Sequence, residues 1–287
     1  MGNSSYSSTT RSVRAETMGY FTKSPNEIFT KRTLDIAMNP KDVKIREARD
    51  SEEHPNSLPI VLALDVTGSM GRIPADLVKD GLPNIMDGII QCGIPDPQVL
   101  FLGIGDHECD DAPLQAGQFE SGDEELDKWL TSLYIESGGG GNDGESYLLA
   151  WYFAGYHTIT DHFEKRGKKG FLFTIGDEPT LKNIPQKAIQ NIMGTGQFQD
   201  YTAVELLEKA RKMYNVYHLH LKQGHNGTRA DVMGGWKQLI GDNLIIVNDY
   251  SEISKIIPEI VATKNNETSA SAPIEPSTSP AKPEMML

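Results

Sequence analysis

Five short apolar runs recur along the chain, and longer segments with a different spacing separate them. The runs span residues 59–65, 98–104, 170–175, 216–221 and 243–247. The first is almost continuously hydrophobic and the others are similar, which is typical of strands that are buried on both faces of a parallel sheet. The pattern therefore predicts five buried strands.

The segments between these runs carry apolar residues at helical spacing, and they span 73–92, 145–163, 202–214, 229–240 and 251–263. This alternation predicts an α/β fold, a doubly wound and mostly parallel central sheet flanked by helices, with right-handed crossovers. Ligands bind such sheets beyond the carboxyl ends of the strands. The residues that follow each strand are therefore the candidates for function.

The same pattern divides the chain into three parts. Residues 58–263 form the predicted α/β domain. Residues 1–57, here called the N-terminal extension, are polar with scattered apolar side chains; we expect the first dozen to be disordered and the remainder to lie on the domain. Residues 264–287 are rich in Ser, Thr and Pro with little to bury, so they are predicted to form a disordered tail.

Charge and composition narrow the class of function. The 287 residues include 27 Lys and Arg against 40 Asp and Glu, which gives a net charge of −13. This sign argues against nucleic-acid binding and favours cations or basic partners. Two cysteines are too few for a disulfide framework, and no apolar stretch approaches the roughly 18 residues of a membrane helix. We therefore expect a cytoplasmic protein without a membrane segment.

Oxygen-bearing side chains follow two of the predicted strands. Asp65, Thr67 and Ser69 lie within five residues directly after the first strand, and Asp177 follows the strand at 170–175. If these strands are neighbours, both carboxylates lie at one edge of the sheet. Mg²⁺ prefers octahedral oxygen coordination and keeps some waters, so hydroxyls and carboxylates in this arrangement are plausible ligands.

Residues 137–146, here called the middle loop, contain four consecutive glycines and lead into a predicted helix. Such a run indicates either mobility or a close approach of the backbone. Asn142 and Glu145 also have the spacing of a helix capping box. Capping by Asn142 or Asp143 does not exclude contact of the other residue with a metal ion.

At these residues the chain resembles the von Willebrand factor A family over roughly 58–263. The family's metal-ion-dependent adhesion site uses Asp-x-Ser/Thr-x-Ser after the first strand, a Thr in a Gly-Gly-Thr loop, and an Asp after a later strand. The first element matches Asp65, Thr67 and Ser69, and the last matches Asp177. The amino-acid sequences of these loops suggest a bacterial or phage member of the family.

The middle loop departs from the family pattern, because Gly-Gly-Asn142-Asp143 stands where the family has Gly-Gly-Thr. The third hydroxyl is therefore missing, and Asn142 or Asp143 is expected to supply an oxygen instead. The resemblance implies a non-enzymatic binding module. Its Mg²⁺ or Mn²⁺ would bind an Asp or Glu of a partner protein, and the implied metal ligands are Asp65, Thr67, Ser69, Asn142 and Asp177.

Two alternatives stay open. The run Asp65-Val66-Thr67-Gly68-Ser69 also resembles the phosphorylation loop of P-type ATPases and of haloacid-dehalogenase-like phosphatases, in which Asp65 would be the nucleophile. Val66 stands where the transport enzymes have Lys, and no second Asp follows two residues after Asp65 as the phosphatases require. The other alternative is an assembly scaffold in which the N-terminal extension and the tail make the contacts and the site is vestigial.

An acidic segment, residues 106–111, follows the second predicted strand and includes one His and one Cys. No second spaced pair of ligands accompanies it, as a structural zinc site would require. We interpret it as a solvated acidic loop near the site, with Asp106 nearest to the water shell of the metal ion.

Overall fold

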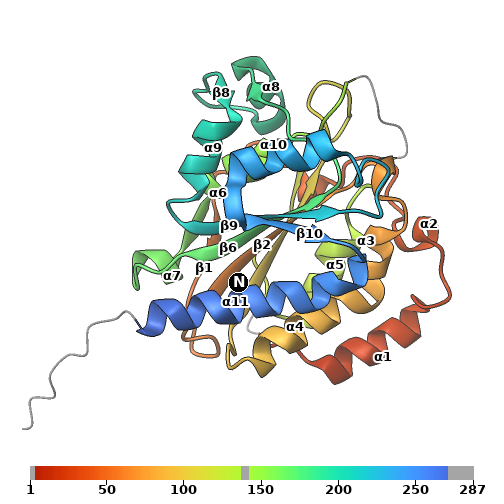
Figure 1. Ribbon diagram of the computed structural model, residues 1–287. Helices are drawn as coiled ribbons and strands as arrows, with labels where there is room; N and C mark the ends of the chain where they lie inside the picture. Colours follow the sequence, from red (N-terminus) through yellow and green to blue (C-terminus); the bar gives the residue numbers. More distant parts are fainter. Residues whose placement is uncertain (1–3, 137–141, 271–287) are drawn as a thin grey trace, which may run out of the picture.

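The computed structural model describes residues 4–136 and 142–270, and a six-stranded sheet lies at its centre (Figure 1). The strand order is β10-β9-β6-β2-β3-β4, and every pair is parallel except β3 with β4. The strands are β2 (Leu58–Asp65), β3 (Pro97–Ile104), β4 (Leu114–Ala116), β6 (Gly170–Gly176), β9 (Tyr214–Leu221) and β10 (Leu244–Val247). The predicted α/β class and all five predicted strands are confirmed; the three-residue β4 was not predicted.

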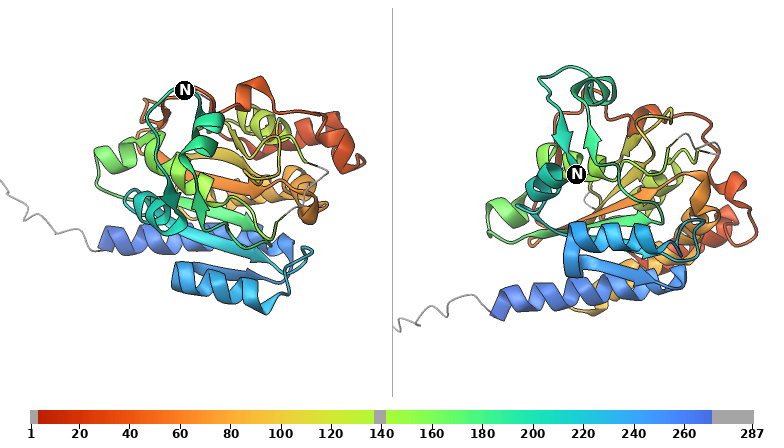
Figure 2. Two further views of the ribbon diagram at one scale, coloured as in Figure 1. Left: turned by 90° about the horizontal axis from the view of Figure 1, so that it is seen from above. Right: turned by 45° about the horizontal axis from the view of Figure 1, so that its top comes forward.

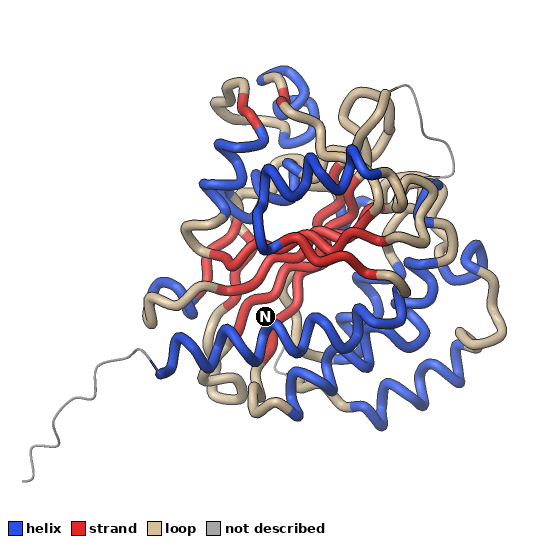
Figure 3. Tube along the Cα trace, viewed as in Figure 1, coloured by secondary structure: helices blue, strands red, loops and turns tan. Residues whose placement is uncertain are grey.

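Helices cover both faces of the sheet, as Figures 1 and 3 show. Alternate residues of one strand point to opposite faces, so that Leu62 packs in one core cluster and Val61 in the other. The first face is covered by α1 (Ser8–Met18), α4 (Leu82–Gln91), α5 (Asp123–Thr131) and α11 (Ile253–Ala270). The second is covered by α6 (Leu148–Tyr156), α8 (Gln186–Met193), α9 (Ala203–Ala210) and α10 (Ala230–Ile240).

Two predicted helices differ from the observed ones. Segment 73–92 is helical as predicted but consists of α3 (Ile73–Asp76), a π-helical turn (Leu77–Gly81) and α4. In segment 145–163 the prediction of one helix is wrong, because α6 ends at Tyr156 and is followed by β5 (Thr158–Thr160) and α7 (Asp161–Glu164). β5 pairs in parallel with β1 (Arg46–Ala48) of the N-terminal extension, a long-range contact that local spacing does not reveal.

The remaining short elements are α2 (Pro25–Ile28), β7 (Asn183–Ile184) and β8 (Tyr201–Thr202), together with single 3₁₀ turns at Ile36–Met38, Gly68–Met70, Gly241–Asn243 and Tyr250–Glu252. β7 and β8 pair as an antiparallel ribbon. Figure 2 shows α1 and α10 well separated, in keeping with their packing on opposite faces of the sheet.

The predicted disorder of the first dozen residues is wrong from Ser8 onward, because α1 begins there. Arg11 is buried and pairs with Asp127 at 3.2 Å, and the Tyr20 hydroxyl donates to Asp127 at 2.7 Å. These contacts with α5 hold α1 in place. At the other end, α11 continues to Ala270, and the rest of the predicted tail lies outside the described residues.

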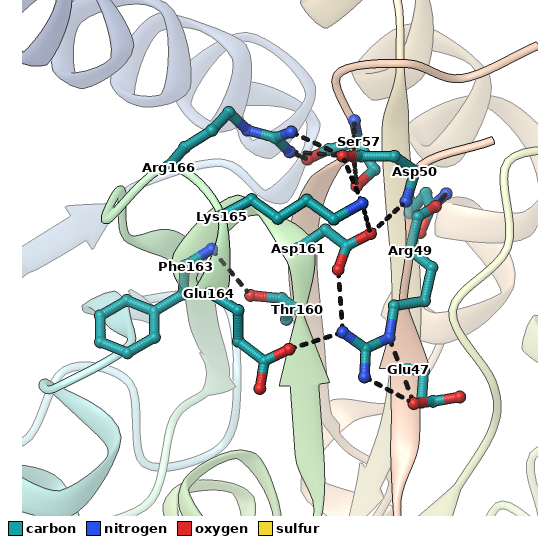
Figure 4. Close-up of polar contacts among 11 residues, drawn as sticks. Glu47, Arg49, Asp50, Ser57, Thr160, Asp161, Phe163, Glu164, Lys165 and Arg166 are labelled. Atoms are coloured by element: carbon teal, nitrogen blue, oxygen red, sulfur yellow. Dashed lines mark hydrogen bonds and ion pairs between the residues drawn. The ribbon is translucent and has the colours of Figure 1, made fainter. Parts of the chain in front are cut away.

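A network of charges fixes the later part of the N-terminal extension to α7 and the turn that follows it (Figure 4). Asp50 accepts hydrogen bonds from Arg166 at 2.8 and 3.1 Å and from the Ser57 hydroxyl at 2.8 Å. Burial acts to raise the pKa of Asp50, but the bonds from Arg166 and Ser57 outweigh it and hold that pKa well below its usual range. Arg49 adds an ion pair with Asp161 at 2.8 Å. The N-terminal extension is therefore packed against its own domain.

Two further properties of the described residues concern membrane-spanning helices and the cysteine thiols. No helix among them combines the length and apolar content that crossing a bilayer requires. Cys92 and Cys109 are free thiols, and both are exposed.

Candidate functional site

Asp65 and Asp177 lie next to each other at the carboxyl ends of β2 and β6. The parallel register pairs Leu64 with Ile175, which places Asp65 beside Gly176 and one residue from Asp177. Both carboxylates are fully buried. The pKa of Asp65 is raised to about 7, chiefly by burial. The charge of Asp177 also raises this pKa, whereas the hydrogen bonds from Thr67 lower it. The sheet therefore brings two predicted site carboxylates into one buried region.

Hydrogen bonds hold the Asp65 carboxylate at both oxygens. Its Oδ1 accepts from the Thr67 amide at 2.9 Å and from Thr67 Oγ1 at 2.6 Å, and its Oδ2 accepts from the Tyr147 hydroxyl at 2.9 Å. Thr67 thus lies where the sequence motif predicts it. The backbone of Ser69 lies in the turn Gly68–Met70, and its side chain is outside the described part of the structure.

The loop that follows β9 packs directly on Asp177. The Asn226 amide donates to Asp177 Oδ2 at 2.7 Å. A Cβ atom on Gly224 would lie 2.3 Å from Asp177 Cγ, so this approach requires a residue without a side chain. No motif in the sequence indicates that a third strand end takes part in the site.

Asn142 and Asp143 of the middle loop lie on the surface, although one of them was expected to supply an oxygen to the metal ion. Asn142 is exposed, and its amide donates to Glu108 at 2.8 Å. Asp143 is also exposed and forms a two-pronged pair with Arg229, with one bond of 2.8 Å. Neither caps the following helix, since the N-cap of α6 is Tyr147. The capping prediction is therefore wrong.

Glu145 is the middle-loop residue that enters the buried acidic region. Only 8% of it is exposed, and its Oε2 atom is buried without a hydrogen-bond partner. Its backbone is fixed, because its amide donates to the Pro179 carbonyl and its carbonyl accepts from the Leu181 amide, both at 2.9 Å. The middle loop is thereby joined to the loop that carries Asp177.

Several carboxyl groups surround Glu145, and no basic neighbour is among the leading influences on its pKa. Burial raises this pKa to about 10, and the charges of Asp65, Asp110, Asp106 and Glu178 add to the shift. Asp106 is itself buried, whereas Glu108 and Asp111 of the same loop are exposed. The loop after β3 is therefore only partly the solvated loop that the sequence suggested.

The donor set fits a divalent cation that prefers oxygen. Asp65, Thr67, Asp177 and Glu145 offer only carboxylate and hydroxyl oxygens, the ligands of Mg²⁺ and Mn²⁺. A buried ionised carboxylate needs a compensating charge, and Glu145 Oε2 is buried without a hydrogen-bond partner. Among the described residues, no group of three or more His, Cys, Asp or Glu side chains lies in an arrangement that could hold a metal ion. The fit to a divalent cation therefore lies in the chemistry of the donor atoms.

Sequence reasoning missed Glu145 and Tyr147. The spacing of Glu145 from Asn142 favours a capping box and does not indicate that Glu145 is buried. One signal was available: the residues from Tyr147 onward form an unbroken apolar run, Tyr-Leu-Leu-Ala-Trp-Tyr-Phe-Ala, which indicates a helix buried on all sides. Residues at the start of such a helix are carried into the core.

A scan of protein-family models finds no match for the sequence, and a search of the curated proteins also finds none. Solved structures with a similar fold include the pilus adhesin SpaC from Lactobacillus rhamnosus GG in its open conformation, with a TM-score of 0.46 and 12% identity. That alignment covers 77% of this chain and 30% of SpaC.

Two further structures share this level of similarity. Proximal thread matrix protein 1 from the mussel byssus has a TM-score of 0.44 and 12% identity, over 71% of this chain and 47% of that one. The SpRpn10 VWA domain has a TM-score of 0.43 and 10% identity, over 68% of this chain and 93% of that one. These values are too low to carry a function to this chain.

The raised pKa values predict how stability changes with pH when no cation is present. Glu145 and Asp65 shift upward from ordinary values of 4.5 and 3.8 to about 10 and about 7, so folding favours their neutral forms. Their contribution to stability is complete below the unfolded-state values and is lost as the pH rises through the folded ones. In EDTA, we expect the free energy of unfolding to fall between about pH 5 and about pH 9.

The Glu145→Gln variant should lose less stability over this range, because its amide does not titrate. Urea unfolding followed by circular dichroism at several pH values measures both slopes. Asp242→Asn, which changes an exposed carboxylate paired with Lys237, serves as the control and should follow the wild type. Equal slopes for wild type and Glu145→Gln would show that Glu145 ionises freely in the folded protein.

Proposed function

We propose that this chain is a non-enzymatic protein-binding module that holds Mg²⁺ or Mn²⁺ at the carboxyl edge of its sheet and uses the ion to bind an acidic residue of a partner protein. The observation that supports this proposal best is the burial of Asp65, Asp177 and Glu145 in one region, with an oxygen of Glu145 left unbonded. A divalent cation would offset two of the three negative charges that these residues carry when ionised.

The proposed ligands come from three loops. Asp65, Thr67 and Asp177 retain the roles that the sequence motif gives them, and Ser69 is included on the sequence motif alone. Glu145 replaces Asn142 as the contribution of the middle loop, because Glu145 is buried beside Asp65 whereas Asn142 is exposed and bonded to Glu108. The site would then have three carboxylates, one more than the motif requires.

Each of these side chains is held by its own fold element. Asp65 is oriented by Thr67 and Tyr147, and Asp177 by the Asn226 amide. When bound, the cation would supply an electrophilic position for a carboxylate of the partner. Because Asp65 and Asp177 have no exposed surface, the loops that cover them must move apart before a partner side chain can reach that position.

The surroundings of the site indicate what else the partner carries. Glu108 and Asp111 are exposed acidic residues on the loop after β3. A groove of about 960 Å³ lies beside the middle loop, and Val204 and Trp236 are among its apolar lining residues. We therefore propose a partner segment whose acidic residue is flanked by basic and apolar side chains, since a purely acidic segment would be repelled.

Calorimetric titration with Mg²⁺ tests the metal site. We expect wild type to bind one Mg²⁺ and Asp65→Asn to bind it at least about a hundredfold more weakly, because the variant loses one charged ligand. Asp143→Asn is the matched control, since Asp143 is exposed and paired with Arg229, and its affinity should equal that of wild type. Equal affinity of wild type and Asp65→Asn would remove the site from consideration.

Substitutions in the middle loop test which of its residues binds the cation. Glu145→Gln should lower Mg²⁺ affinity by about tenfold or more, whereas Asn142→Ala should leave it unchanged. The same calorimetric titration measures both. A loss of affinity in Asn142→Ala with none in Glu145→Gln would restore the ligand assignment that the sequence motif suggested.

A pull-down from lysate in Mg²⁺, repeated in EDTA, tests whether the ion mediates partner binding. A partner retained in Mg²⁺ and released by EDTA is the expected result. A partner that remains bound in EDTA, and that also binds Asp65→Asn, would contradict a metal-bridged contact.

A further inference from the structure

Tyr147 places a hydroxyl between the two strands that carry the site carboxylates. Its Oη donates to Asp65 Oδ2 at 2.9 Å, and the residue is fully buried. It belongs to the same segment as Glu145, directly before α6 begins at Leu148. The segment that lacks the expected threonine therefore still brings a hydroxyl to Asp65.

The neighbouring strand is shaped to admit this hydroxyl. A Cβ atom on Gly176 of β6 would lie 1.8 Å from Tyr147 Oη and 3.0 Å from Asp65 Cβ. No residue with a side chain could stand at position 176 without displacing the phenol. The space for the hydroxyl thus depends on a glycine that lies directly before Asp177.

The ring of Tyr147 is fixed as firmly as its hydroxyl. It makes edge contacts with His218 at 5.3 Å and with Trp236 at 5.4 Å between ring centroids. His218 and Trp236 are stacked on each other at 3.5 Å, and Trp236 donates to the Glu178 carbonyl at 2.9 Å. A phenol held on these sides cannot follow Asp65 if that carboxylate turns, so it sets the orientation of Asp65 instead.

We propose that Tyr147 is a positioning residue of the site: its hydroxyl fixes the orientation of the Asp65 carboxylate, whereas Glu145 supplies the ligand of the middle loop. This inference rests on the proposed metal-binding function. With Oδ2 bonded to Tyr147 and Oδ1 to Thr67, the carboxylate is held in one plane before a cation arrives. Partners that orient metal ligands in this way typically contribute ten- to hundredfold to metal affinity.

Tyr214 shows what a purely structural tyrosine looks like in this protein. It is equally buried, and its hydroxyl forms a hydrogen bond of 2.7 Å with Thr158 of β5. Its partner is a neutral hydroxyl in the short sheet with β1, and not a carboxylate of the site. Tyr214→Phe is therefore a matched control for Tyr147→Phe, since each removes one buried, hydrogen-bonded hydroxyl and keeps the ring.

Calorimetric titration of the full chain with Mg²⁺ tests the inference, with circular dichroism to confirm folding. We expect Tyr147→Phe to lower Mg²⁺ affinity by about tenfold or more and Tyr214→Phe to leave it unchanged. Equal affinity of wild type and Tyr147→Phe would overturn the positioning role while leaving the proposed function intact. No Mg²⁺ or Mn²⁺ binding by wild type would overturn the proposed function, and the inference with it.

Gly176→Ala provides a second test, because its methyl group would occupy the space of the hydroxyl without removing a ligand. It should weaken Mg²⁺ binding in the same direction as Tyr147→Phe. If neither variant folds while Tyr214→Phe does, Tyr147 serves the core and not the site, and the inference is wrong.

Discussion

The burial of several carboxyl groups in one region, at the carboxyl edge of a parallel sheet, is the constraint on which the candidate site depends. Asp65 and Asp177 are brought together because β2 and β6 are neighbours in parallel register, and Glu145 joins them because its backbone is bonded to the loop after β6. Charges so placed repel one another and lose hydration. Protonation would remove these charges, and a divalent cation would offset two of them while the carboxylates stay ionised.

Hydrogen bonds and close backbone contacts from the surrounding elements hold these carboxyl groups in position. Residues at the start of α6 link the middle loop to two strand ends, since the Ser146 amide donates to the Gly105 carbonyl at 3.1 Å and Tyr147 reaches Asp65. Glycines at 176 and 224 allow neighbouring groups to approach the site carboxylates closely. The N-terminal extension is packed against its own domain through Arg11 and Asp50, which leaves the scaffold alternative without support from those contacts.

Much of this architecture could be predicted from sequence, for a definite physical reason. A strand buried on both faces must be apolar throughout, so β2 and β6 were visible as hydrophobic runs, and Asp65, Thr67 and Asp177 followed from where those runs end. The features that depend on distant partners were not visible. Pairing of β1 with β5 is one of them, and the burial of Glu145, which local spacing assigned to a helix cap, is another.

Diffraction from crystals grown with Mn²⁺ would show whether one divalent ion binds between the ends of β2 and β6. The anomalous signal of manganese locates the ion without reference to any assumed ligand. We expect one strong peak within coordination distance of oxygens from Asp65, Asp177 and Glu145. A peak elsewhere on the molecule, or none at saturating Mn²⁺, would contradict this expectation.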